Sequence, residues 1–588
     1  MEKYENFQFS VFMTVGCLNK MFGPNGDPEK EFAYYSKYTK FGKVYLESFR
    51  GEATPLDILL RAKAFFEERG IKTATAIMPS YSAQFDCSAR MLCFTNPDVR
   101  DLFSNFIASM CEYFDELMID DSLSTDCTCD RCREAKGERT WQDFRTQLMT
   151  DFCRECIIEP AKRVNPNVTI TLKYPTWQEA YQILGYNTET QPPMFDNIYT
   201  GTETRHTTYS LFRNPRYTSY SILRYLSSFP PHNNRGGWFD TIQCANNMNY
   251  VCEQGELTLM AAAEEVTLFC WSLSYDTMFP PALGYFFDRT DRFLGKLGKP
   301  IGIPVYLPHH AKGEDYLGDY LGMCGVPTDP TVTFPEDGRA VILTAASTYD
   351  KDLLNKVKAH LEKGGNVFMT SGCLEKLQDA GANEFTAMRV TNRSMQSNEF
   401  GGFDWAWGND CEYYRAEKEI SMPVIDWGTN ENEMFAVQVR QDFPNMLLAR
   451  SWYSRGKLWL LNVPDTYSDY YLLPARVMGY LRKYLSVDMP VWMEGQNQVA
   501  IFPKDNNTVA LKSFLEHGTV VELHVKGKSE SLTSLVTGVV YKPYAVVQRS
   551  SQMFTDPGNL TLPVAEEKME TVYRIPMDPL TLDAFAWE

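Results

Sequence analysis

Short apolar runs alternate with longer amphipathic segments over the first 300 residues of the chain. The first run, 7–15, alternates in the manner of a strand, whereas 55–69 has the apolar spacing of a helix. Pro55 begins this helical segment and Gly70 follows it, which is where helix ends prefer these residues. The pattern predicts eight strands separated by helices, at 7–15, 43–49, 73–78, 116–120, 168–173, 197–200, 237–241 and 266–271.

Eight strands that alternate with helices over about 300 residues match a (β/α)8 barrel in number and size. An open, doubly wound sheet is the alternative arrangement. We predict an α/β chain in which residues 1–300 form a TIM barrel. Residues 301–487 have the pattern of a smaller α/β domain with a parallel sheet and a polar, aromatic-rich insertion at about 376–445. The short alternating strands of 488–588 predict a β-sandwich.

Charged and aromatic residues follow the predicted barrel strands, at the end where a barrel enzyme keeps its chemistry. The fourth strand, for example, runs directly into two adjacent carboxylates, Asp120 and Asp121. A single such residue is explained by a solvated loop, but the whole set predicts a catalytic mouth. Its members lie at or just past the strand ends: Glu47 and Arg50 for the second strand, Asp120 and Asp121 for the fourth, Lys173 for the fifth, Glu203 and Arg205 for the sixth, Trp238 and Asp240 for the seventh, and Trp271 for the eighth.

Three cysteines follow the two aspartates at C-x-C-x-x-C spacing, as Cys127, Cys129 and Cys132. Thiolates this close in sequence suit a structural zinc ion that would hold the loop. The chain has 15 cysteines, an odd number in a protein large enough to form full cores. We therefore expect most of them to be reduced thiols of a cytosolic protein, and those with apolar neighbours to be buried and inert.

The formal net charge of −18 would repel a phosphate backbone, so nucleic acid is not an expected partner. No apolar run of about 18 residues is present, and the start of the chain lacks the basic and apolar stretches of a signal peptide. We expect no membrane association and a cytoplasmic location. Aromatic residues make up 14% of the chain, which suits sugar binding because sugar faces stack on rings.

The order of the three domains and the cysteine cluster after the fourth strand resemble the family 42 glycoside hydrolases, the β-galactosidase-type enzymes. The resemblance implies a flavodoxin-like middle domain that forms a homotrimer, an oligosaccharide or glycoside substrate, and no organic cofactor. It also implies a fourth zinc ligand from the loop after the third strand. Cys93 occupies that place, so Cys93, Cys127, Cys129 and Cys132 are the candidate zinc site.

We expect an exo-acting glycosidase that removes a galactoside-like or related hexose, with retention as the first prediction and inversion left open. Two carboxyl groups must then face the scissile bond. We assign Asp121 as acid/base, with its pKa raised by Asp120, and Asp240 as nucleophile; Glu203, kept ionised by Arg205, is the alternative nucleophile. The family carries Asn-Glu and Glu where this chain has Asp120-Asp121 and Asp240. Because α-galactosidases often place the nucleophile after strand four, the anomeric preference stays open.

The remaining mouth residues are candidates for substrate binding. Asp120, Glu47, Arg50, Lys173 and Arg205 could bind hydroxyls or an anionic substituent, and Trp238 and Trp271 could be sugar platforms or core residues. Three other functions remain open. They are a non-catalytic carbohydrate-binding protein, a zinc-dependent carbohydrate deacetylase or hydrolase, and an amidotransferase-like activity of Ser371-Gly372-Cys373 with His360 as the base.

Overall fold

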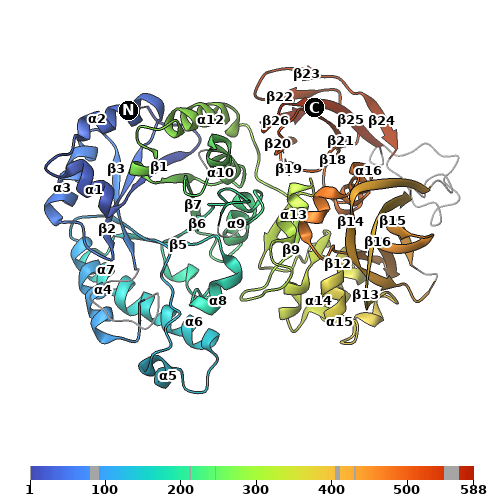
Figure 1. Cartoon of the computed structure of the whole chain (residues 1–588), viewed down its shortest axis with the longest axis horizontal. Coiled ribbons are helices and arrows are strands. Elements are labelled where there is room, and N and C mark those ends of the chain that lie inside the picture. The colour runs from blue at the N-terminus through green and yellow to red at the C-terminus, as the bar shows by residue number, and fades with distance from the viewer. Residues whose placement is uncertain are drawn as a thin grey trace. The chain divides into compact units, whose positions relative to one another are not determined.

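The computed structural model describes residues 2–79, 92–210, 213–244, 247–403, 411–429, 432–548 and 569–588. The chain divides into two compact units, Met1–Gly295 and Lys296–Glu588. In Figure 1 the first unit carries the blue to green elements and the second unit carries the yellow-green to red ones.

The first unit is built on a closed barrel of eight parallel strands that pair in chain order, so the TIM-barrel prediction is confirmed. Each strand is four to eight residues long and is mostly buried, because helices cover its outer face (Figure 1). The strands are β1 (Gln8–Met13), β2 (Lys43–Arg50), β3 (Lys72–Met78), β4 (Glu116–Ile119), β5 (Thr169–Tyr174), β6 (Asn197–Gly201), β7 (Asn234–Asp240) and β8 (Glu265–Phe269).

Polar side chains cap several of the surrounding helices. The Asn96 side chain accepts a hydrogen bond from the Asp98 amide at the start of α4, and Thr140 does the same for Asp143 at the start of α6. The main helices are α1 (Val15–Phe22), α2 (Pro28–Tyr38), α3 (Leu56–Glu67), α4 (Pro97–Met110), α6 (Trp141–Phe152), α7 (Glu159–Val164), α9 (Thr218–Ser227), α10 (Met248–Met260) and α12 (Phe279–Leu294).

Two predicted strands extended two residues past the observed C-terminal ends, at Met13 of β1 and Phe269 of β8. Val15 begins α1, and Trp271 begins the short helix α11 (Trp271–Ser274). Both residues therefore take part in helix starts at the barrel mouth, where backbone N–H groups have no partner within the helix.

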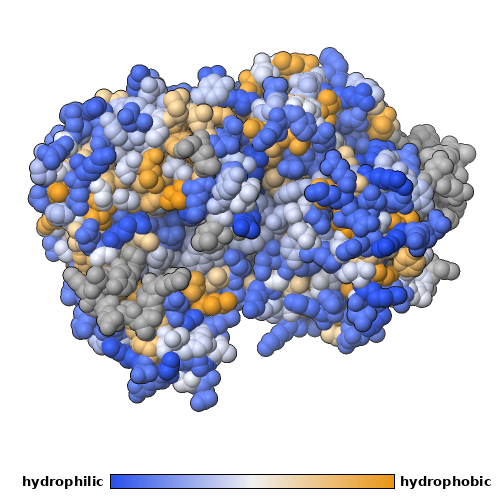
Figure 2. Space-filling view, in the orientation of Figure 1, coloured by the Kyte–Doolittle hydropathy of each residue, from blue (hydrophilic) through white to orange (hydrophobic). Residues whose placement is uncertain are grey.

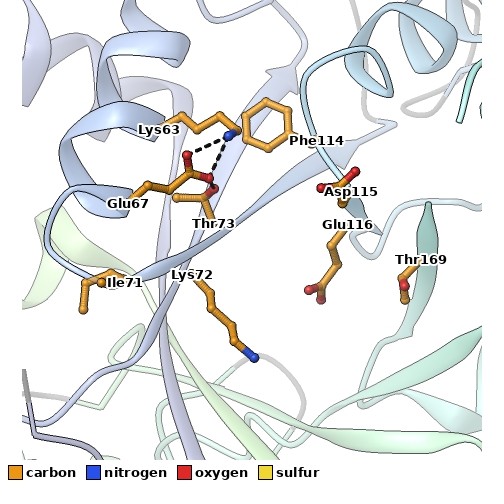
Figure 3. A pocket seen from close by; sticks show the side chains of 10 residues that line it. Lys63, Glu67, Ile71, Lys72, Thr73, Phe114, Asp115, Glu116 and Thr169 are labelled. Atoms are coloured by element: carbon orange, nitrogen blue, oxygen red, sulfur yellow. Dashed lines mark hydrogen bonds and ion pairs between the residues drawn. The ribbon is translucent and has the colours of Figure 1, made fainter. Parts of the chain in front are cut away.

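The opposite end of the barrel is closed by an ion-paired floor. The buried Lys43 ammonium contacts Glu116, lies 3.2 Å from Glu265 Oε2 and donates to the Tyr45 hydroxyl at 2.7 Å. A cavity of about 410 Å³ lies beside this floor, between α3 and the starts of β3 and β4 (Figure 3). The amino ends of the strands face this cavity, so it lies away from the residues that follow the strands.

The second unit contains a nine-stranded sheet. Its five parallel strands have the order β10-β9-β11-β12-β17, which is the flavodoxin-like order 2-1-3-4-5. The region predicted as an insertion, 376–445, supplies antiparallel strands that continue the same sheet. The strands are β9 (Ile303–Tyr306), β10 (Thr328–Thr331), β11 (Val341–Leu343), β12 (Asn366–Thr370), β13 (Arg389–Phe403), β14 (Cys411–Asp426), β15 (Glu433–Arg440), β16 (Phe443–Tyr453) and β17 (Gly456–Leu461).

The chain ends in a β-sandwich of a four-stranded and a five-stranded sheet, as predicted. Alternate residues such as Val499, Leu511 and Leu523 fill the space between the sheets. The buried Arg482 of α16 (Ala475–Leu485) donates to the carbonyl oxygens of Cys324 and Gly495, which ties the sandwich to the nine-stranded sheet. In chain order, the first strand of the sandwich is β18 (Val491–Glu494) and the last is β26 (Leu582–Trp587).

Hydrophilic side chains cover most of the face shown in Figure 2, and apolar residues form small scattered groups there. Within the described part of the chain, no helix combines the length and the apolar character needed to cross a bilayer.

Candidate active site

Lys173, near the end of β5, lies at the centre of the charged residues that follow the barrel strands. Its buried Nζ is 3.3 Å from Asp120 Oδ1, 3.4 Å from Asp121 Oδ2 and 3.6 Å from Glu203 Oε1. The ammonium also lies 4.2 Å from the centre of the Trp238 ring. Burial alone would lower the pKa of Lys173, but the three carboxylates raise it above its usual value, so the side chain stays charged.

The two adjacent aspartates have different surroundings because consecutive residues point in different directions. Asp120 is buried and accepts hydrogen bonds from Arg50 and from the Asp121 amide, whereas the Asp121 side chain is 28% exposed. Burial raises the pKa of Asp120 to about 6. Burial acts in the same direction on Asp121, but the Lys173 charge outweighs it and lowers the pKa. The expectation that Asp121 has the raised pKa is therefore wrong, and Asp120 has it instead.

Glu203 lies two residues beyond the end of β6 and is almost fully buried. Its Oε2 has no hydrogen-bond partner among the described residues. Burial raises the pKa of Glu203 to about 7, although Lys173 pulls it down. The expectation that Arg205 keeps Glu203 ionised is not met, because the Arg205 guanidinium makes its ion pair with another carboxylate.

That carboxylate is Asp240, the last residue of β7. Arg205 Nε lies 3.1 Å from both Asp240 oxygens and Nη2 lies 2.7 Å from Oδ2, which is a two-pronged ion pair. The Ile242 amide also donates to Asp240 at 3.0 Å. Burial raises the pKa of Asp240 against the lowering effect of Arg205. The sequence brought both residues to the mouth but did not predict that they pair.

A second chain of ion pairs reaches the mouth from β2. Arg50 Nε donates to Glu47 Oε1 at 2.7 Å, and Arg50 Nη2 lies 3.2 Å from Asp120 Oδ2. The fully buried Glu47 also accepts the Val15 amide at 2.9 Å, and burial raises its pKa to about 7. Sequence reasoning missed Val15 as a partner because it extended the first strand through that residue.

The two tryptophans lie in different places. Trp238 is buried beneath Lys173, and its ring packs 4.6 Å from Phe12. Trp271 is fully buried; its ring stacks on Tyr35 at 3.9 Å and its Nε1 donates to Glu31. Of the two roles left open for Trp271, sugar platform and core residue, the structure confirms the core residue, because the ring presents no free face to a sugar. The physical reason is that it begins α11 and turns into the helical layer.

The four cysteines Cys93, Cys127, Cys129 and Cys132 form a cluster in which all sulfur atoms lie within 4.8 Å of one another. The Cys93 sulfur is 3.6 Å from those of Cys129 and Cys132. A tetrahedral zinc with bonds of about 2.3 Å would place its sulfur ligands about 3.8 Å apart, so the cluster can hold such an ion. Four protein ligands leave no open position, which fits a structural metal site and not a catalytic one.

The Ser371-Gly372-Cys373 turn of the second unit lacks the features of a thiol nucleophile. Cys373 is fully buried, and burial raises the pKa of its thiol well above the usual value. The Gly372 amide donates to the buried Glu314 carboxylate, which occupies the space beside the turn. The amidotransferase-like alternative therefore has no support from this geometry.

Family models match three consecutive parts of the chain. Residues 1–280 match the catalytic domain of a probable glycosyl hydrolase, 298–466 match the second domain of the uncharacterized protein SSO3021, and 490–585 match the C-terminal domain of a probable glycosyl hydrolase. The uncharacterized protein SSO3021 of Saccharolobus solfataricus is 24% identical over 526 residues, which cover 80% of this chain and 85% of that protein.

Solved structures of β-galactosidases, among them the GH42 enzyme Gan42B, share the fold along the whole chain. Gan42B is 11% identical with a TM-score of 0.63 and covers 100% of this chain and 99% of its own. A catalytic mutant of Gan42B from G. stearothermophilus is 11% identical with a TM-score of 0.64, and the Bacillus circulans sp. alkalophilus β-galactosidase is 10% identical with a TM-score of 0.63; each covers 99% of both chains. At 10–11% identity, these likenesses show that the fold is shared.

Proposed function

We propose that this chain is a retaining glycoside hydrolase that removes a terminal, uncharged hexose, galactoside-like or related, from an oligosaccharide or glycoconjugate. One observation carries the proposal: Asp121 and Glu203 contact the same Lys173 ammonium, yet their pKa values are shifted in opposite directions. Two carboxyl groups with separated pKa values are what glycoside hydrolysis requires, since one must be ionised while the other is protonated.

The pKa shifts of Asp121 and Glu203 support catalytic roles that differ from those predicted from the sequence. Asp121, which is ionised and the most exposed of these carboxylates, is the proposed nucleophile. Its oxygen attacks the anomeric carbon and forms a glycosyl ester, while Glu203 gives its proton to the departing oxygen. Glu203 then takes a proton from water, whose oxygen attacks the anomeric carbon and releases the sugar from Asp121. Lys173 remains charged and holds both carboxyl groups in place.

The contacts to Lys173 set an upper limit on the separation of the two carboxyl groups, and the retaining range falls within that limit. Each has an oxygen within 3.6 Å of Lys173 Nζ, so these oxygens are at most about 7 Å apart. Retaining enzymes have a separation of about 5–5.5 Å, whereas inverting enzymes have about 6.5–9.5 Å because a water molecule must fit between. Asp240 is the alternative nucleophile; its pairing with Arg205 better suits binding of a sugar hydroxyl.

The local charge favours an uncharged sugar. Five carboxyl groups meet three cations here, and each cation already contacts one or more of these carboxylates. A uronate or sulfate group would have to displace one of these ion pairs. Glu47, Arg50, Asp120 and Arg205 are therefore proposed to orient hydroxyl groups and neighbouring carboxylates, with Trp238 packed beneath them.

Leaving-group dependence tests the two roles separately. Glu203→Gln should lower turnover of phenyl glycosides by about 10³-fold, because they need a proton, but should spare dinitrophenyl glycosides, which do not. Asp121→Asn should abolish turnover of both classes in either anomeric series, and Glu189→Gln, at an exposed carboxyl group of the same unit, is the control. NMR of the first-formed anomer from wild-type protein tests retention. Full activity of Asp121→Asn would remove Asp121 from the mechanism.

Three further properties are proposed together with this function. Zinc is the proposed ion of the four-cysteine site, because its preferred thiolate geometry matches the cluster.

A homotrimer is proposed from the resemblance alone, and light scattering should give three times the 67.5 kDa chain mass. A cytoplasmic location is supported by the 13 cysteines whose side chains the structure describes, since none of these forms a disulfide, and cell fractionation tests it.

The other functions left open by the sequence have less support. A non-catalytic carbohydrate-binding protein would show sugar binding without turnover of any aryl glycoside in the panel. A zinc-dependent deacetylase needs an open metal position, which four thiolate ligands do not provide.

A further inference from the structure

A cluster of three aromatic rings begins at His206, the residue that follows Arg205 of the Arg205–Asp240 ion pair. It consists of His206 and Tyr209, from the loop after β6, and Tyr250, from the first turn of α10. The His206 ring packs against both tyrosines, 4.5 Å from the ring centre of Tyr209 and 4.4 Å from that of Tyr250. None of these three residues was singled out in the sequence.

The backbone conformation of Arg205 explains why the His206 side chain points in a different direction from that of Arg205. Arg205 has a φ of 58°, a left-handed conformation that turns the chain sharply. The Arg205 guanidinium reaches Asp240, while the next side chain, His206, packs against Tyr209 and Tyr250. Both the loop after β6 and the start of α10 belong to the end of the barrel that carries the charged site.

Two hydrogen bonds brace the loop that carries the cluster. His206 Nδ1 accepts the Thr208 amide at 3.1 Å, and the His206 carbonyl accepts the Ser210 amide at 2.8 Å. Tyr250 is fixed in turn by the buried Arg216, whose guanidinium lies 4.8 Å from the Tyr250 ring centre and pairs with Glu253. A ring held this way loses little conformational entropy when a ligand stacks on it.

The Tyr209 ring is supported on one side by His206 and is nevertheless 68% exposed. An exposed aromatic ring on a fixed support presents an electron-rich face, and the C–H groups on one side of a pyranose ring are complementary to such a face. Its hydroxyl group can also bond to a sugar hydroxyl. The cluster therefore has the chemistry of a sugar platform at the edge of the charged site.

We propose that His206, Tyr209 and Tyr250 form a binding site for a second sugar ring, outside the ring that is cleaved. This inference rests on the proposed function and specifies its substrate as an oligosaccharide instead of a simple glycoside. Tyr209 makes the stacking contact; His206 and Tyr250 are positioning residues that hold its ring.

Two substrates with the same cleaved sugar separate this site from the reaction itself. A galactosyl fluoride has no second ring, whereas a galacto-oligosaccharide of two to four units has one. Tyr209→Ala should lower kcat/KM for the oligosaccharide about tenfold and leave turnover of the fluoride unchanged. Tyr209→Phe keeps the ring and should retain most of the activity on the oligosaccharide.

Tyr285→Ala is the matched control, because Tyr285 on α12 is 67% exposed and lies outside the cluster. Equal effects of Tyr209→Ala and Tyr285→Ala on the oligosaccharide would overturn the proposal, as would an equal loss of fluoride turnover in Tyr209→Ala.

A binding measurement decides the inference even if the proposed reaction fails. If wild-type protein hydrolyses neither substrate, titration calorimetry with the same galacto-oligosaccharides still compares the variants. Weaker binding by Tyr209→Ala than by Tyr285→Ala supports the platform. Equal binding by the two variants, or no binding by the wild-type protein, contradicts it.

Discussion

Lys173 Nζ and Asp121 Oδ2 lie 3.4 Å apart, and Asp121 is the one carboxylate partner of Lys173 that solvent reaches appreciably. The Asp120 and Glu203 side chains are 2% and 6% exposed, against 28% for Asp121. One buried cation thus keeps an accessible carboxylate ionised while burial keeps its neighbours protonated to a higher pH. This relationship separates the proposed nucleophile from the proposed acid.

Replacing Lys173 by methionine should damage both stability and activity. The change leaves Asp120, Asp121 and Glu203 without their shared counter-ion, and breaking a buried ion pair in this way costs about 3–5 kcal/mol. Urea unfolding of Lys173→Met should show a loss of that size. Lys63→Met removes the surface pair with Glu67 drawn in Figure 3 and should cost at most about 1 kcal/mol. Similar losses in the two variants would contradict the central role of Lys173.

The pH dependence of stability should report on Glu203. In the folded chain Glu203 keeps its proton up to about pH 7, whereas the unfolded side chain releases it near 4.5. Because the folded state binds the extra proton, this contribution to stability is fully present below pH 4.5 and is lost as the pH rises through 7. The unfolding free energy of Glu203→Gln should therefore fall less than that of wild type between these pH values.

The control for this measurement is Glu189→Gln, which changes an exposed carboxyl group of the same domain. Its pH dependence should match that of wild type. A pH dependence of Glu203→Gln that also matches wild type would show that Glu203 does not titrate near neutrality.

Arg205 and Asp240 should be energetically coupled. Arg205→Met leaves the buried Asp240 without its two-pronged partner and should raise the pKa of Asp240 further, while Asp240→Asn removes the charge from the other side. A double-mutant cycle on unfolding free energies should give a coupling of about 1–3 kcal/mol. Arg205→Lys keeps the charge but loses the planar guanidinium group, so it should retain only part of the coupling free energy with Asp240. Additive effects of the two single changes would exclude the pairing.

Removal of one thiol should empty the cysteine cluster. Elemental analysis of wild-type protein should find one zinc per chain, and Cys132→Ser should lose the metal together with part of the thermal stability, because metal binding is coupled to folding of the loop. Cys111→Ser, a buried cysteine outside the cluster, should keep the metal. Metal-free wild-type protein, purified without chelators, would contradict the zinc assignment.

Local sequence patterns were sufficient to predict much of the architecture. The eight barrel strands, the parallel sheet of the second unit and the terminal sandwich follow from apolar periodicity, because burial acts on every strand in the same way. The C-x-C-x-x-C spacing likewise brings Cys127, Cys129 and Cys132 together, since residues so close in sequence cannot be far apart.

The ends of elements were less predictable. Val15 and Trp271 continue apolar runs, so periodicity placed them in strands, but both begin helices at the barrel mouth. An apolar residue is equally suited to a strand and to a buried helix turn. The fully buried ring of Trp271 and the hydrogen bond from the Val15 amide to Glu47 both follow from this difference.

The sequence alone determined which ionisable residues reach the mouth, because each one follows its own strand. Only the tertiary structure decided which of them pair, since pairing joins strands that are distant in the chain. Arg205 lies two residues from Glu203 yet binds Asp240, and Lys173 lowers the pKa of Asp121 while burial raises that of Glu203. A pKa depends on the distance to every nearby charge and on the depth of burial, and neither quantity can be read from residue order.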